Sequence, residues 1–441
     1  MSDIVETLST HVFPMLRNLA ISIFDFRPND VRSNFASLPD NIIRENIPRL
    51  TSLSVNGMLF NWTIIQGLRV LRVVFEGTYS VAFSFEDIID ALKRNPLLEE
   101  FEIRLPWRII PRISISSDTV SLPRLTSIRI HGIVQLSSSL LHSLASVPHS
   151  ASIYVDDKTP NATEIQHNIF VLEDDAPPEQ GILASYAALL AYFSQHVKQD
   201  HGPVIQTVSL RQTMARDFSG QIIFHIRIAG SLRADQYREP GPWDPESVER
   251  VFVGIATRTS SEAGLDSENI LLNVLGSWPL EQATHLDARY AHGFEVAQWD
   301  ATFDKMPAVT TVIVKAGSSI TDTLLEVLFK DLHMRGRRII THIIIDAADV
   351  YPYFRMQMLG SSGELAESLS RLTLLRVLLY CAEASRAKLP LDTVEVIHDD
   401  KGHLLGPSSE ADIDWSELYN GLERGFVHQG VMYNSVTGCA V

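Results

Sequence analysis

The sequence predicts an α/β solenoid in which irregular repeats of helix and strand build one mainly parallel, curved sheet. Three observations lead to this prediction. A short apolar frame recurs along the chain, a proline precedes many of its copies, and helix-like stretches lie between them. Each repeat would be too small to bury its own apolar face, so neighbouring repeats would stack and share a core.

The recurring frame is a proline, any residue, an aliphatic residue, two residues, an apolar residue, one residue and a second apolar residue. Chance would place roughly two of the 21 prolines before such a pattern, and six are found there. These six are Pro14, Pro48, Pro96, Pro123, Pro203 and Pro307. Without a proline, the frame recurs at Leu68/Leu71/Val73, Ala283/Leu286/Ala288, Ile340/Ile343/Ile345 and Leu391/Val394/Val396.

The frame is typical of a short β-strand. Its last two apolar residues are two positions apart, so they point to one face of an extended chain while the residue between them points to the other. A proline suits the first position of a strand and stops a preceding helix. We expect one continuous core to contain Leu19, Leu53, Leu71, Phe101, Ile128, Ile153, Val208, Leu286, Val312, Ile343 and Val394.

Helix-like stretches precede several of these strands. Ser84 is placed to cap a helix from Phe85 to Lys93, and Asn95 followed by proline would end it. The longest stretch runs from residue 182 to 197. Thr321 is expected to cap a further helix. Helix, proline and strand therefore alternate, as a solenoid of α/β repeats requires.

Three parts of the chain are expected from the spacing of the repeats. Residues 1–155 hold the most regular repeats, 156–260 form an irregular insertion with extra strands, and 261–441 continue the same solenoid. Within the insertion, residues 156–178 are rich in Asp, Pro and Asn and indicate a loop. Strict alternation of apolar residues over 222–228 predicts an extra strand.

Composition limits the possible functions. The net charge is −16 without a long basic block, which argues against nucleic-acid binding because that binding depends on Lys and Arg contacts to phosphate. The densest basic run, residues 335–338, is expected to be a solvated turn. No apolar run is long enough to span a membrane, and Asp3 and Glu6 do not suit a signal peptide. With only Cys381 and Cys439, we expect a reducing compartment, the cytoplasm or nucleus.

No motif points to catalysis or to a cofactor. The sequence lacks Gly-x-Ser-x-Gly, His-Glu-x-x-His and Gly-x-x-x-x-Gly-Lys-Ser/Thr. The segment from His398 to His403 could hold a cation, but a polar turn after a strand explains it more simply. We therefore expect no catalytic residue, no cofactor and no metal site. An enzyme of unrecognised class is the remote alternative.

The residues between the paired apolar positions are the candidate binding residues, because they would line the concave face of a solenoid. They are Arg72, Glu100, Glu102, Arg104, Arg129, His131, Tyr154, Asp156, His285, Asp287, Arg289, Lys315 and Asp346. Charges of both signs with Tyr and His suit a protein partner. The repeats are most regular near the N-terminus, so the predicted partner-binding surface is Arg72, Glu102, Arg104, Arg129, His131 and Tyr154. The loop-rich region 156–260 is the alternative.

The Leu-x-x-Leu-x-Leu core with an α/β repeat resembles the leucine-rich-repeat superfamily, whose solenoids form a horseshoe. The irregular repeat lengths and two sequence segments resemble those of F-box leucine-rich-repeat proteins of mushroom-forming fungi. The segments are Pro96-Leu-Leu-Glu-Glu-Phe-Glu-Ile103 and Leu122-Pro-Arg-Leu-Thr-Ser-Ile-Arg-Ile130. In that family an F-box docks on a Skp1-type adaptor of a cullin ubiquitin ligase, and the repeats hold the substrate. This chain departs from the pattern because a repeat begins at Pro14 and leaves no room for a preceding F-box.

The resemblance implies a non-enzymatic protein-interaction scaffold. More specifically, it implies the substrate-recognition part of an SCF-type ubiquitin ligase receptor, with a Skp1-type adaptor as partner only if an F-box exists upstream. The alternative is a stand-alone structural or sensing solenoid with no ligase link. The expected partner is an unknown protein, with neither nucleic acid nor membrane involved.

Overall fold

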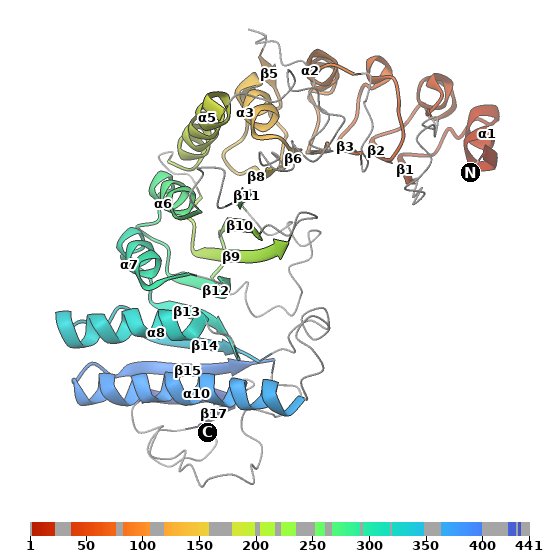
Figure 1. The fold of residues 1–441 in the computed structure, drawn as a ribbon. Coiled ribbons are helices and arrows are strands. Elements are labelled where there is room, and N and C mark those ends of the chain that lie inside the picture. The colour runs from red at the N-terminus through yellow and green to blue at the C-terminus, as the bar shows by residue number, and fades with distance from the viewer. Residues whose placement is uncertain are drawn as a thin grey trace. The chain divides into compact units, whose positions relative to one another are not determined.

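The chain consists of two compact units, each built on a mostly parallel sheet with helices (Figure 1). The first unit is Met1–Pro203 with Val251–Leu265, and the second is Val204–Arg250 with Asp266–Val441. The computed structural model describes residues 2–22, 37–75, 83–105, 119–157, 179–198, 203–216, 222–234, 252–260, 267–291, 294–317, 320–347, 363–398, 422–428 and 431–433.

In the first unit, the main sheet has parallel strands in the order β1-β2-β3-β4-β6-β8-β11. The strands are β1 (Asn18–Ser22), β2 (Ser52–Asn56), β3 (Val70–Val74), β4 (Glu100–Arg104), β6 (Ser127–Gly132), β8 (Ser152–Asp157) and β11 (Val253–Ser260). The short strands β5 (Val120–Ser121) and β7 (Leu144–Ser146) form a separate parallel pair. A parallel sheet of this kind needs a crossover between successive strands.

The apolar frames of the first unit lie side by side in register. Leu53 is paired with Leu19 on one side and Leu71 on the other. The same row continues through Phe101 and Ile128 to Ile153 and Val253. Every member of this row is buried. The strand prediction is therefore confirmed for this unit, and so is the burial of its six predicted core residues.

The helices of the first unit stand along one face of its sheet (Figure 1). They are α1 (Ser2–Thr10), α2 (Phe85–Arg94), α3 (Val134–Ser143) and α5 (Glu179–Val197), with the short turns η1 (Ile42–Asn46) and η2 (Trp62–Ile64). Ser84 caps α2 as predicted. Its hydroxyl accepts from the Asp87 amide, and the Asp87 carboxylate accepts from the Ser84 amide at 2.7 Å.

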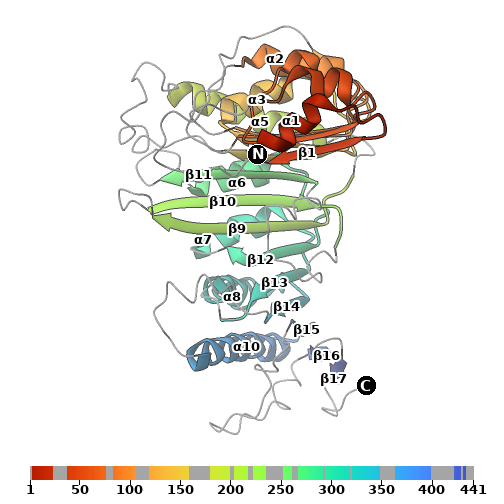
Figure 2. The same ribbon diagram turned by 90° about the vertical axis from the view of Figure 1, so that its right-hand side faces the viewer.

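In the second unit, the sheet runs β10-β9-β12-β13-β14-β15-β16-β17. The strands are β9 (Thr207–Arg216), β10 (Ile222–Ser231), β12 (His285–Ala291), β13 (Thr311–Lys315), β14 (His342–Asp346), β15 (Leu391–Ile397), β16 (Leu422–His428) and β17 (Val431–Tyr433). Figure 2 shows β10, β9 and β12 side by side. The pairs β10–β9 and β16–β17 are antiparallel and the others are parallel. The strand predicted over 222–228 is therefore confirmed as β10.

The frames of the second unit are also in register. Val208 pairs with Leu286, Leu286 with Val312, Val312 with Ile343, and Ile343 with Val394. All five are buried. The shared frame therefore identified the inward row in both units.

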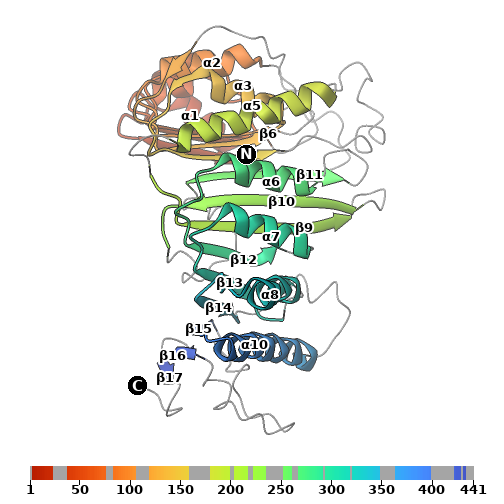
Figure 3. The ribbon, with the colours of Figure 1, turned by 90° about the vertical axis from the view of Figure 1, so that its left-hand side faces the viewer.

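In the described part of the second unit, four helices cover one face of the sheet (Figure 3). They are α6 (Ser267–Ser277), α7 (Val296–Lys305), α8 (Ile320–Lys330) and α10 (Gly363–Arg386), with the turn η6 (Asp331–Arg335) after α8. Thr321 does not cap α8 as expected, because it is already the second residue of the helix. The basic run at 335–338 covers the end of η6 and the irregular segment after it, in which Gly336 adopts a left-handed conformation with φ of 60°.

Backbone hydrogen bonds join the starts of neighbouring strands. Two successive amides at the start of one strand donate to the carbonyl of the residue that precedes the neighbouring strand. In the first unit, the amides of Thr51 and Ser52 both donate to the carbonyl of Arg17, and those of Glu99 and Glu100 donate to Arg69. In the second unit, Thr310 and Thr341 continue the same pattern. Threonine hydroxyls add to it, since Thr341 Oγ1 donates to the Thr310 carbonyl at 3.3 Å. The repeated turn therefore has the same backbone geometry in both units.

The region predicted as an insertion, 156–260, contributes to both units. Strands β8 and β11 and helix α5 belong to the first unit, whereas β9 and β10 belong to the second. Residues 158–178, most of the predicted loop, lie outside the described residues. The division into 1–155, 156–260 and 261–441 stays a prediction.

Candidate partner-binding surface

The six predicted surface residues lie together on four neighbouring strands of the first unit. Arg72, Glu102, Arg129 and Tyr154 form one row across β3, β4, β6 and β8. Arg104, His131 and Asp156 form the next row along the same strands. Adjacent members of a row sit on strands about 4.8 Å apart. We call this set of residues, with Glu100, the polar strip.

The polar strip lies on the sheet face opposite the buried apolar row, because its members alternate with that row along each strand. Its exposure is uneven. The side chains of Arg72 and Arg104 are 40% and 31% exposed, whereas those of Arg129 and Glu102 are only 14% and 8% exposed. His131 and Tyr154 are buried. The strip therefore combines accessible arginines with buried polar residues on the same face of the sheet.

The charges of the polar strip are paired within it. Arg72 Nη2 lies 2.7 Å from Glu100 Oε2. Glu102 is shared, since Arg104 Nε donates to Oε1 at 2.7 Å and Arg129 Nη1 lies 3.9 Å from Oε2. Two guanidinium groups therefore compensate the burial of one carboxylate, as a buried charge requires.

His131, in the second row, contacts Asp156 of the same row and Tyr154 of the first row. Its Nδ1 lies 3.1 Å from Asp156 Oδ2, and its ring centroid lies 5.7 Å from that of Tyr154. Burial lowers the pKa of His131, and Arg104 lowers it further, although the Asp156 carboxylate acts in the opposite direction. His131 is therefore neutral near pH 7, with Asp156 orienting its ring.

The second unit does not present the outward residues as the sequence predicted. Asp287, Arg289, Lys315 and Asp346 lie on the predicted face but are buried, and only His285 is partly exposed. These four residues are therefore not available on the surface as candidate binding residues. The physical reason is visible in the middle of the same face, where Ile313, Ile344 and Ile397 form a buried apolar cluster. Alternation assigns a residue to a face of a strand but does not tell whether that face is covered.

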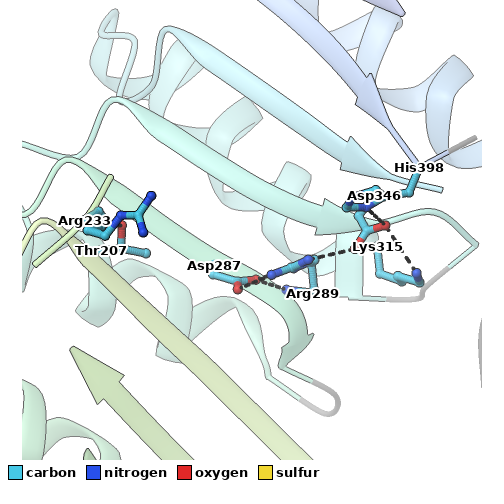
Figure 4. A network of polar contacts seen from close by, with 7 residues as sticks. All are labelled: Thr207, Arg233, Asp287, Arg289, Lys315, Asp346 and His398. Carbon is cyan, nitrogen blue, oxygen red and sulfur yellow. Dashed lines mark hydrogen bonds and ion pairs between the residues drawn. The ribbon is translucent and has the colours of Figure 1, made fainter. Parts of the chain in front are cut away.

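The buried charges of the second unit form an ion network centred on Asp346 (Figure 4). Asp346 accepts from Arg289 Nη1 at 2.8 Å and from His398 Nδ1 at 3.2 Å, and Lys315 Nζ lies 3.5 Å away. Arg289 also donates to Asp287 at 2.8 Å. Burial by itself would lower the pKa of Arg289, but the two carboxylates outweigh it and raise that pKa. The network links β12, β13, β14 and the end of β15, so its evident role is structural.

Sequence reasoning missed a second buried network, which joins three elements of the first unit. The carboxylate of Asp157 on β8 accepts from the hydroxyl of Tyr186 on α5 and from Thr257 Oγ1 on β11, the latter at 3.2 Å. Burial and the neighbouring Asp157 raise the pKa of Tyr186 well above its ordinary value. One signal was present in the sequence. Two consecutive acidic residues, Asp156 and Asp157, end a strand, so one of them must point inward.

The remaining sequence predictions concern the cysteines, metal binding and membrane spans. Cys381 is a buried free thiol, while Cys439 and His403 lie outside the described residues. Among the described residues, no three His, Cys, Asp or Glu side chains are placed to hold a metal ion. Within the same ranges, every helix is too short or too polar to cross a membrane. No protein-family model and no curated protein matches this sequence.

Proposed function

We propose that this chain is a non-enzymatic protein-interaction scaffold of the leucine-rich-repeat type, and that the polar strip binds its partner. The observation that carries the proposal is the alignment of the strip, in which side chains of β3, β4, β6 and β8 stand in two rows. The recurrence of one strand frame in register supports the repeat architecture.

The composition of the polar strip suits a protein partner. It combines three arginines with three carboxylates, a histidine and a tyrosine, so it can select a partner by complementary charge. Arginine and tyrosine are also the residues that most often anchor interfaces. Ion pairing within the strip holds long side chains in place, which lowers the entropy lost when a partner binds. We expect binding with moderate sensitivity to salt, because the accessible charges are only partly screened.

The first step of the test is to recover the partner by co-purification with the tagged chain. The second is a charge exchange, Arg72→Glu with Glu100→Arg. This pair is accessible, and the exchange keeps an ion pair while reversing its direction on the strip. We expect the double variant to lose most of its partner binding and to keep the melting temperature of the original chain.

The matched control is the exchange Asp90→Lys with Lys93→Asp. These residues form an exposed ion pair on helix α2 of the same unit, on the covered side of the sheet. The control should bind the partner normally. If binding instead survives the exchange at Arg72 and Glu100 and disappears when residues 158–178 are trimmed, which leaves Asp156 and Asp157 in place, the loop region is the binding site and the strip is not.

The more specific role, substrate recognition in an SCF-type ubiquitin ligase, rests on the family resemblance. It predicts that a longer form of the protein with an upstream F-box retains a Skp1-type adaptor in a pull-down. A form that carries no F-box and retains no adaptor would favour the alternative, a stand-alone structural or sensing solenoid. Neither outcome alters the proposed binding surface.

A further inference from the structure

Three polar side-chain atoms near the end of β6 are buried without a hydrogen-bond partner. They are Nε2 of His131 and both amide atoms of Gln135, which lies four residues further on at the start of α3. The His131 side chain is only 9% exposed. Buried polar atoms in proteins nearly always have a partner, so several unpartnered atoms within five residues need an explanation. A group supplied from outside the chain is one.

The hydrogen bond to Asp156 determines what His131 can accept. A carboxylate cannot donate, so the proton of the neutral ring must be on Nδ1, which lies 3.1 Å from Asp156 Oδ2. Nε2 then carries a lone pair and is an acceptor. A second proton on the ring is opposed by burial and by the nearby charge of Arg104. The nitrogen therefore requires a donor.

The charges around the ring select the kind of donor. Asp156 bonds to the ring, and Glu102 contributes a second negative charge, whereas Arg104 contributes a positive one. A carboxylate or phosphate could not bond to an unprotonated nitrogen and would meet these acids. Resting on the proposed function, we infer that His131 Nε2 is the acceptor of a subsite for a lysine-type ammonium group of the partner, which would lie on the side of the ring away from Asp156.

Entry of such a group requires neighbouring atoms to move. Nε2 has no exposed area, so a covering side chain must move aside. Arg104 is the charged neighbour, it is partly exposed, and it would repel an ammonium group. Glu102 would keep Arg129 as a partner if Arg104 were removed. The subsite therefore predicts that Arg104→Gln binds an ammonium probe more tightly than the original chain.

The test uses the full chain with ¹⁵N-labelled histidine and four small probes. These are n-butylammonium, sodium butyrate, tetramethylammonium and 1-butanol. The His131 resonances are assigned with His131→Gln or, should that variant not fold, by the shift that Asp156→Asn causes. We expect the free protein to show an unprotonated Nε2. We also expect a saturable shift of Nε2 with n-butylammonium alone, and a severalfold lower dissociation constant in Arg104→Gln.

Three results would overturn the inference. One is a proton on Nε2 in the free protein, another is the absence of any n-butylammonium response, and the third is an equal response to butyrate, tetramethylammonium or butanol. The proposed function is tested separately by the exchange at Arg72 and Glu100, which leaves His131 and Asp156 unchanged. A failed subsite with a working exchange would mean that the strip binds its partner through other contacts.

Discussion

Nε of Arg104 donates a 2.7 Å hydrogen bond to Oε1 of Glu102, a carboxylate that is almost fully buried. The bond joins the two rows of the polar strip, because Glu102 belongs to one row and Arg104 to the other. It also means that Arg104 has two roles. The side chain is accessible to a partner, and it compensates a buried charge of its own unit.

Removal of the Arg104 side chain should therefore lower the stability of the first unit more than removal of the Arg72 side chain. Arg104→Ala leaves Glu102 with Arg129 as its remaining cation, so we expect a loss of about 1–3 kcal/mol in the free energy of unfolding, the range for a buried group that loses a partner. Arg72→Ala, at an exposed pair, should stay within about 0.5 kcal/mol. Urea melts of the two variants check this. Equal losses would mean that Glu102 does not depend on Arg104.

Truncation of the apolar row should be more costly. Leu53 and Ile128 are completely buried and lie in one row of the first unit's sheet. Leu53→Ala and Ile128→Ala should each lower the free energy of unfolding by roughly 2–5 kcal/mol, because a cavity is left behind. Chemical denaturation of each variant measures this directly. A loss below that of Arg72→Ala would contradict the assignment of the row to the core.

The hydroxyl of Tyr186 should stabilise the junction between α5, β8 and β11. Tyr186→Phe removes a donor from the buried carboxylate of Asp157, while Thr257 still donates to that carboxylate, so we expect a loss of about 1–3 kcal/mol. The matched control is Tyr192→Phe on the same helix, which should change stability less. Thermal melts compare the two. The junction would have to be reconsidered if the control were the more damaging.

Acid should destabilise the first unit partly through two histidines. Burial lowers the pKa of both His131 and His196 in the folded state. The unfolded chain therefore takes up protons first as the pH falls through about 6.5, and stability is lost below that value. Each of the two histidines is therefore expected to destabilise the folded chain as the pH falls from 7.5 to 5.5. The groups that face His131 are Glu102, Arg104 and Asp156.

Urea melts at the two pH values test this expectation. The variant His131→Asn with His196→Asn should lose less stability on acidification than the original chain, while the remaining carboxylates contribute equally to both. An unchanged difference between the two pH values would show that the histidines titrate normally in the folded protein.

Much of the fold could be predicted because one frame encodes both the strand and its inward face. The register of Leu53 with Leu71, and of Val312 with Ile343, follows when equivalent positions of successive repeats are aligned. Alternation along each strand also predicted which residues belong to the polar strip. The ion pairs among these residues could not be predicted, since alternation carries no information on which arginine reaches Glu102.

Two further features depended on contacts distant in sequence. Asp157 and Thr257 are 100 residues apart and belong to different repeats, so no local pattern could join them. The burial of Lys315 and Asp346 depends on what covers a second face of the sheet, and the sequence of a single strand does not encode this. The helix cap at Ser84 was predicted because all of its partners lie within three residues.

The most direct measurement of the central claim is photo-crosslinking from single positions on the two faces of the first unit. Arg72→p-benzoylphenylalanine places the reactive group on the polar strip, and Lys93→p-benzoylphenylalanine places it on helix α2. If the strip binds the partner, irradiation of the complex yields a crosslinked product from position 72 and none from position 93. A product from position 93 alone would contradict the assignment of the polar strip as the binding surface.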